Sequence, residues 1–238
     1  MRPSKREFNQ LREISIQTNV NKYAEGSCLI NWGKNQILCT ATIENKVPPF
    51  LRNSNKGWIT AEYSMLPRST HSRNQRDSNR KSPNGRGLEI QRLIGRSLRS
   101  IIDLKKLGER QIIIDCDVLQ ADGGTRCASI TGGYIALKLA INKLLKDRII
   151  TSDPITQSLL AVSCGIFKSK TILDLDYDED SNCEADVNFI VTKDAKIIEI
   201  QGTGEEKPFD FTEINSMYEM VQQAALEISQ IQENAINA

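Results

Sequence analysis

The order of strand-like and helix-like runs is the feature that most constrains the fold of this 238-residue chain. Three strand-like runs precede the first run with helical spacing, one lies between the first two helical runs, and the rest follow the second. Strict β-α-β alternation would indicate a doubly wound parallel sheet, whereas grouped strands favour helices packed on mixed sheets. We therefore predict an α+β fold with mixed or antiparallel sheets, and the length allows either one large domain or two small ones.

The strand-like runs begin with a β-hairpin. Residues 27–32 and 36–43 are strand-like, and Gly33, Lys34 and Asn35 between them supply the turn. The further strands are expected over residues 58–65, 111–119, 159–167, 171–177, 187–192 and 196–201.

Apolar residues recur at helical spacing in three segments. One helix is expected over residues 88–107, with Gly108 as its C-cap. A second is expected over residues 125–146, and a third begins with Asp210 or Thr212 as its N-cap.

Charge is strongly segregated, although the net charge is only +1. Residues 67–99 hold nine basic and two acidic side chains, a net charge of +7, and the chain from Asp174 onward holds three basic and sixteen acidic ones, a net charge of −13. One part of the molecule can attract polyanions, and the other can hold cations.

The basic segment begins with a long loop, residues 67–86, that is almost free of apolar side chains. Binding of a nucleic-acid backbone explains arginines that would otherwise only repel one another. The loop has no Phe, Tyr or Trp, so phosphate contacts are expected rather than base stacking. Its arginines are Arg68, Arg73, Arg76 and Arg80, with Arg86 where the loop meets the helix. On the helix, Arg92, Arg96 and Arg99 recur on one face, which fits a solvated face or salt bridges as well as a binding surface.

Two further segments carry candidate chemistry. Gly123, Gly124, Thr125 and Arg126 lie between a buried strand and a helix, where backbone N–H groups and an arginine fork make a phosphate-sized anion site, or an ordinary turn. The carboxylates crowded into residues 174–188 suit Mg²⁺ or Mn²⁺, or form an acidic surface turn. A phosphate site, a polyanion-binding loop and a metal site together fit phosphoryl transfer.

Other function classes receive little support. The six cysteines are scattered singly, which is typical of buried thiols in a reducing compartment, and the single histidine, His71, excludes a multi-histidine metal site. The basic start of the chain leads into polar residues, and no apolar run approaches the ~20 residues of a membrane span. Export and membrane insertion are not expected.

Several long motifs resemble the ribonuclease PH family, and the resemblance extends over essentially the whole chain. The motifs are Arg2-Pro3-Ser4, residues 24–27, 57–68, 89–99, 115–118 and 120–126, and Glu199-Ile200-Gln201-Gly202-Thr203.

The resemblance implies the fold of that family, as a single domain over residues 1–238, and a phosphorolytic 3′→5′ exoribonuclease. Such an enzyme trims tRNA precursors and other RNA 3′ ends, including those of rRNA, with inorganic phosphate as co-substrate, and releases nucleoside diphosphates in a reversible reaction. It implies a cytoplasmic homohexamer built as a trimer of dimers. By position, the resemblance assigns phosphate binding to Arg86, Gly124, Thr125 and Arg126, catalysis and Mg²⁺ binding to Asp180 and Asp186, and tRNA binding to Arg68, Arg73 and Arg76.

Two departures from the family pattern border the phosphate site, because Gly87 and Cys127 each stand where Thr is common. A third lies near the start of the chain, where Lys5 replaces a usual Gly or Asn. Two other readings remain open at this point: a catalytically silent RNA-binding ring subunit, and a hydrolytic metal-dependent exonuclease.

Overall fold

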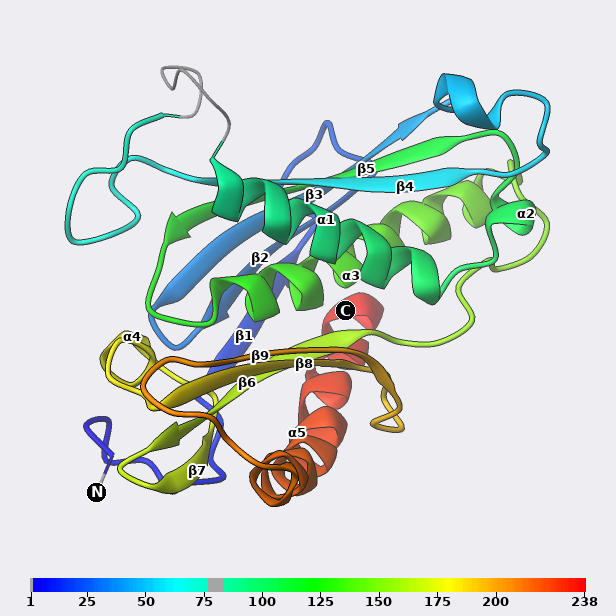
Figure 1. Cartoon of the computed structure of the whole chain (residues 1–238). Coiled ribbons are helices and arrows are strands. Elements are labelled where there is room, and N and C mark those ends of the chain that lie inside the picture. The colour runs from blue at the N-terminus through cyan, green and yellow to red at the C-terminus, as the bar shows by residue number, and fades with distance from the viewer. Residues whose placement is uncertain (1, 77–83) are drawn as a thin grey trace.

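The computed structural model describes residues 2–76 and 84–238, and it has two β-sheets with helices between and beside them (Figure 1). In those residues, no helix has the length and apolar character needed to cross a membrane. The two sheets and the helices packed on them confirm the α+β class predicted from the sequence.

The first sheet has five strands in the order β1-β2-β3-β5-β4. β4 and β5 are parallel, and the other neighbours are antiparallel. Apolar side chains alternate along the hairpin, so that Cys28 and Ile30 face the same buried layer as Ile37 and Cys39. The strands are β1 (Ile14–Thr18), β2 (Gly26–Trp32), β3 (Asn35–Glu44), β4 (Trp58–Met65) and β5 (Gln111–Gln120).

The second sheet has four antiparallel strands in the order β7-β6-β8-β9. They are β6 (Leu160–Phe167), β7 (Lys170–Leu173), β8 (Ala185–Val191) and β9 (Ile197–Gly204). Every residue of β6 is buried, because helices pack on both faces of the sheet at this strand.

The longest buried helix, α3 (Thr125–Lys146), lies between the two sheets, where it contacts β2, β3 and β6 (Figure 1). A helix enclosed in this way is apolar around most of its circumference, which is why α3 lacks a clear polar face. α1 (Gly85–Ser100) packs beside α3 on β4, and α5 (Phe211–Asn237) covers the second sheet. The short elements are α2 (Leu104–Leu107), α4 (Tyr177–Asp180) and a 3-10 turn at Pro49–Leu51.

The hairpin, the strand at 58–65, the helix at 125–146 and Asp210 as a helix N-cap agree with the sequence predictions. Asp210 forms a capping box with Glu213. Strand β1 was not anticipated.

The single helix predicted over residues 88–107 is wrong, because α1 ends at Ser100 and α2 begins at Leu104. Between them Ile102 pairs with Ile155, and the Asp103 N–H donates to Pro154 O. The Asp103 side chain then caps α2. Backbone bonds to a distant segment therefore replace the helical ones at this point.

The strand predicted over residues 171–177 also ends earlier than expected, at Leu173. Asp174 has a left-handed backbone with φ of 56°, and Asp176 is already the N-cap of α4. The loop predicted to reach Arg86 ends before α1, which begins at Gly85. Arg80 and Lys81 lie outside the described residues.

Candidate active site

One cavity of about 550 Å³ brings together all six residues that the sequence analysis assigned to phosphate, catalysis or metal. Its walls come from α1, the start of α3, α4, β8 and β9. The six residues are Arg86, Gly124, Thr125, Arg126, Asp180 and Asp186. Segments up to 100 residues apart in sequence thus meet at one polar cavity.

The anion side of the cavity is the start of α3. Gly124 is the N-cap and has a left-handed φ of 70°, which suits glycine. No side chain caps this helix. Within the described part of the chain, no acceptor is recorded for the backbone N–H groups of Gly124, Thr125 and Arg126. Free N–H groups at the positive end of a helix dipole are suited to an anion.

Gly123 connects the anion side of the cavity to the acidic side. Its φ is 73°, and a Cβ at this position would lie 2.6 Å from the backbone carbon of Asp176. The loop before α3 and the start of α4 are therefore in backbone contact, which no larger residue would permit.

The Arg126 side chain is held in place from two other elements. Its Nη1 donates to Gln201 Oε1 of β9 at 2.8 Å, and its Nη2 lies 3.4 Å from Glu89 Oε2 of α1. Gln201 Nε2 in turn donates to Glu89 Oε1 at 3.2 Å. Arg86, in the first turn of α1, is exposed and lines the same cavity.

The acidic side holds Asp180 at the end of α4 and Asp186 in β8. Burial and then the charge of Asp186 raise the pKa of Asp180, while Arg86 and Arg126 oppose that shift. Asn188 donates from Nδ2 to Asp186 Oδ2 at 3.4 Å, and the Cys127 thiol donates to Asn188 Oδ1 at 3.2 Å. Burial raises the pKa of Cys127 to about 12, so this thiol stays protonated.

Asp180 and Asp186 offer the oxygen ligands that a hard divalent cation prefers, but two carboxylates alone do not complete its coordination shell. In residues 2–76 and 84–238, no group of three or more His, Cys, Asp or Glu side chains is arranged to hold a metal ion. Mg²⁺ is commonly held by one or two carboxylates together with substrate phosphates and water. The donor set therefore suits a cation that shares its ligands with a bound phosphate.

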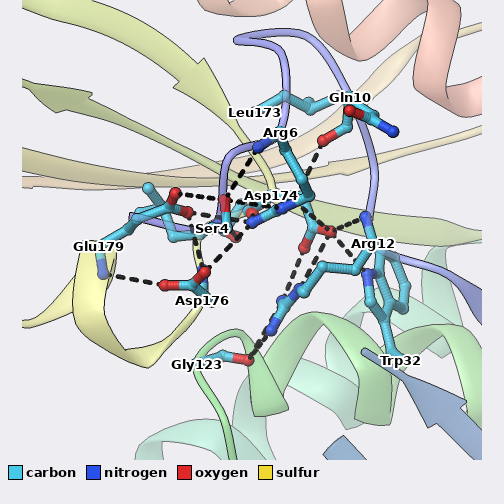
Figure 2. Close-up of polar contacts among 12 residues, drawn as sticks. Ser4, Arg6, Gln10, Arg12, Trp32, Gly123, Leu173, Asp174, Asp176 and Glu179 are labelled. Carbon is cyan, nitrogen blue, oxygen red and sulfur yellow. Dashed lines mark hydrogen bonds and ion pairs between the residues drawn. The ribbon is translucent and has the colours of Figure 1, made fainter. Parts of the chain in front are cut away.

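A buried ionic network behind the cavity was missed at the sequence level (Figure 2). Arg2 pairs with Glu179 at 2.7 Å, and Arg12 pairs with Asp174 at 2.7 Å. Arg6 reaches the carboxylates of both acids. Glu179 precedes Asp180 and forms the capping box of α4 with Asp176, so the network fixes the helix that presents Asp180. The available signal was the crowding of carboxylates, which required buried counter-charges from elsewhere in the chain.

The loop arginines Arg68, Arg73 and Arg76 do not line the cavity. Their loop is nevertheless tied to the anion side, because the Ala121 N–H donates to Ser69 O at 2.8 Å. The segment then extends beyond the end of the first sheet (Figure 1).

The helical arginines lie on a separate surface. Arg96 forms a two-point ion pair with Glu199 of β9, and Arg92 lies beside it on α1. Arg99 donates to Ile59 O at 2.7 Å and stacks over the Trp58 ring. The described contacts of Arg96 and Arg99 thus serve packing and salt bridges, which was one of the two interpretations of this stripe.

Comparisons with known proteins show which families share this architecture. Two family models match: "3' exoribonuclease family, domain 1" over residues 10–141 and "3' exoribonuclease family, domain 2" over residues 158–224.

Proteins called ribonuclease PH are similar over nearly the full length. The one from Cereibacter sphaeroides is 54% identical over 236 residues, 99% of this chain and 100% of that protein. The one from Neisseria meningitidis serogroup C is 51% identical over 233 residues, 98% of this chain and 96% of that protein.

Solved structures with the same fold are more distant in sequence. Rice Rrp46 has a TM-score of 0.80 at 19% identity, covering 99% of this chain and 100% of its own. A chain of the Archaeoglobus fulgidus exosome, solved with RNA bound to the active site, has a TM-score of 0.80 at 20% identity, covering 96% of this chain and 91% of its own.

Proposed function

Since the chain belongs to the ribonuclease PH family of 3′ exoribonucleases, we propose that its cavity between α1, α3 and α4 is the site of phosphorolysis. The protein is a phosphorolytic 3′→5′ exoribonuclease that acts on tRNA. We assign the site to this cavity because the start of α3, which suits an anion, and two carboxylates both line it.

Orthophosphate would lie at the start of α3. The guanidinium groups of Arg86 and Arg126 and the N–H groups of Gly124 and Thr125 would bind its oxygens, since charge-assisted hydrogen bonds to phosphate are among the strongest in proteins. Held there, the phosphate would be in line with the terminal phosphodiester of the RNA, so that its oxygen bonds to phosphorus as the bond to the 3′ oxygen breaks.

The leaving 3′ oxygen needs a proton, which we assign to one of the two carboxyl groups. Without a bound cation, burial and the charge of Asp186 raise the pKa of Asp180, which would favour this carboxyl as the proton carrier. Asp180 and Asp186 would also hold Mg²⁺, with Mn²⁺ as an alternative, and a bound divalent cation supplies positive charge that offsets the charge developing on phosphate and leaving group.

Arg68, Arg73 and Arg76 would bind the body of the tRNA through its phosphates. Their loop starts beside the anion side of the cavity and carries positive charge away from it, which suits a substrate longer than the few nucleotides that the cavity can hold. rRNA 3′ ends offer the same backbone and would be bound in the same way.

The assembly that we propose is a homohexamer, a trimer of dimers, working in the cytoplasm. The likeness to chains of the archaeal exosome and of its core supports an oligomer.

The function is tested with a tRNA that carries a short 3′ extension, incubated with Mg²⁺ with and without orthophosphate. Nucleoside diphosphates released only with phosphate are expected. Monophosphates would indicate a hydrolytic nuclease, and binding of RNA without any release would indicate a silent ring subunit.

A further inference from the structure

We propose that Arg12 and Asn35 are positioning residues for orthophosphate. Together they donate hydrogen bonds to the carbonyl oxygens of Asp122 and Gly123, and these bonds direct the Gly124 N–H toward the cavity. Neither Arg12 nor Asn35 lines the cavity. The inference deepens the proposed function and rests on it, since it assumes that the start of α3 binds phosphate.

Arg12 joins the loop before α3 to Asp174 with one guanidinium group (Figure 2). Its Nη1 donates to Asp122 O at 2.5 Å, and its Nη2 lies 3.3 Å from Gly123 O. The same Nη2 pairs with Asp174 Oδ1 at 2.7 Å, and Nε donates to Asp174 Oδ2 at 3.1 Å. The planar fork of arginine can span both acceptors, whereas an ammonium group cannot.

Asn35 holds the same loop from the start of β3. Its Nδ2 donates to Gly123 O at 2.6 Å, and its Oδ1 accepts from the Asp122 N–H at 2.6 Å. Asn35 is fully buried and has no recorded contact with Asp174. Arg12 and Asn35 therefore hold Asp122 and Gly123 through separate hydrogen bonds.

Because the peptide bond is planar, the hydrogen bonds to Gly123 O also fix the direction of the Gly124 N–H. In a trans peptide the C=O and N–H point in opposite directions, and every peptide described here is trans. With Gly123 O directed at Arg12 and Asn35, the N–H of Gly124 is directed to the opposite side, where Gly124 lines the cavity. Two adjacent glycines would otherwise leave this peptide free to rotate.

Asp174, the partner of Arg12, is itself bonded to a residue that lines the cavity. Its N–H donates to Ser163 O at 2.6 Å, and the next N–H, of Leu175, donates to Ser163 Oγ at 3.1 Å. Ser163 lines the cavity. Arg12 thus links residues 122–124, here called the phosphate loop, to the segment that leads to α4.

The first test compares Arg12→Lys with Arg12→Met. Arg12→Lys keeps a charge opposite Asp174 and should retain most of the thermal stability that Arg12→Met loses. Both variants should raise the KM for phosphate about tenfold to a hundredfold, because small misplacements of binding groups have effects of that size. A role limited to stability would instead let Arg12→Lys restore phosphate KM together with the unfolding temperature.

The second test uses Asn35→Asp, which can still accept from the Asp122 N–H but cannot donate to Gly123 O. It should raise the KM for phosphate as the Arg12 variants do. The matched control is Arg99→Lys, a change at a half-buried arginine whose partners, Ile59 O and the Trp58 ring, lie away from the cavity and from Asp174. That control should lower the unfolding temperature and leave phosphate KM within about twofold of wild type.

Binding of ³²P-labelled orthophosphate, measured by equilibrium dialysis without RNA, should weaken in the same variants. Wild-type phosphate KM in Arg12→Lys and Asn35→Asp would overturn the inference, as would an equal rise in Arg99→Lys. If wild-type protein neither binds phosphate nor depends on it for activity, the proposed function itself fails, and the two failures are thus distinguishable.

Discussion

Asp186 acts on Asp180 on the acidic side of the cavity: burial, and next the charge of Asp186, raise the pKa of Asp180. The two carboxylates come from different elements, the end of α4 and the second residue of β8. A buried carboxyl beside a like charge favours its protonated form. This pair is therefore suited to carry a proton or to share a cation.

In metal-free protein, Asp186→Asn should lower the pKa of Asp180. Removing the neighbouring negative charge makes ionisation of Asp180 less unfavourable, so its titration moves to lower pH. Carbon-13 NMR of the side-chain carboxyl group measures this directly. An unchanged Asp180 titration would show that the two groups do not interact.

Asp186→Asn should also fold normally and still bind RNA, but lose turnover by about a hundredfold or more, the size expected when a charged group that stabilises the transition state is removed. Single-turnover rates, unfolding temperature and RNA affinity are measured on the same preparation. Undiminished turnover would contradict the assignment of this carboxylate, and loss of RNA binding would point to misfolding.

Asp174→Asn should lower the free energy of unfolding at pH 7 by about 3–5 kcal/mol, because it removes the nearest counter-charge of the buried Arg12. Although burial alone would raise the pKa of Asp174, the charge and hydrogen bonds of Arg12 lower it below its usual value.

A lowered pKa in the folded state determines how this difference depends on pH. Asp174 stabilises the protein fully above its unfolded-state pKa of about 3.9, and the contribution is lost as the pH falls through the lower folded-state pKa. Urea unfolding from pH 7 to pH 3 should therefore show the wild type and the variant converging below about pH 4. A constant difference over this range would exclude the ionised pair as its source.

All six cysteines should be unreactive in the folded protein. Each is a free thiol and each is buried, and burial raises the pKa of Cys127 to about 12. A colourimetric thiol reagent should count none before denaturation and six afterwards. Rapid reaction of any thiol in native protein would show that its segment opens.

Much of the fold could be predicted from local patterns. Alternating apolar residues and the Gly33 turn specify the β2–β3 hairpin, and helical spacing specifies α3 to the residue. The break at residues 101–103 could not be predicted, because Asp103 N–H bonds to Pro154 O, 51 residues away. Such a bond leaves no periodic trace in the sequence.

The candidate site was predicted where motifs carry the chemistry. All six assigned residues lie at one cavity, although their roles remain predictions. The supporting residues were not found, since Arg12 and Asp174 are 162 positions apart and only the tertiary structure brings them together. Asn35 was interpreted as a turn residue, yet it pairs in β3 and its side chain reaches the phosphate loop.

The most direct measurement follows the fate of the phosphate itself. A tRNA with a 3′ extension is incubated with Mg²⁺ and ³²P-labelled orthophosphate, and the released nucleotides are separated. Phosphorolysis should place the label in the terminal phosphate of nucleoside diphosphates, at a rate that falls in Arg126→Met. Release of unlabelled monophosphates at the same rate with and without phosphate would contradict it.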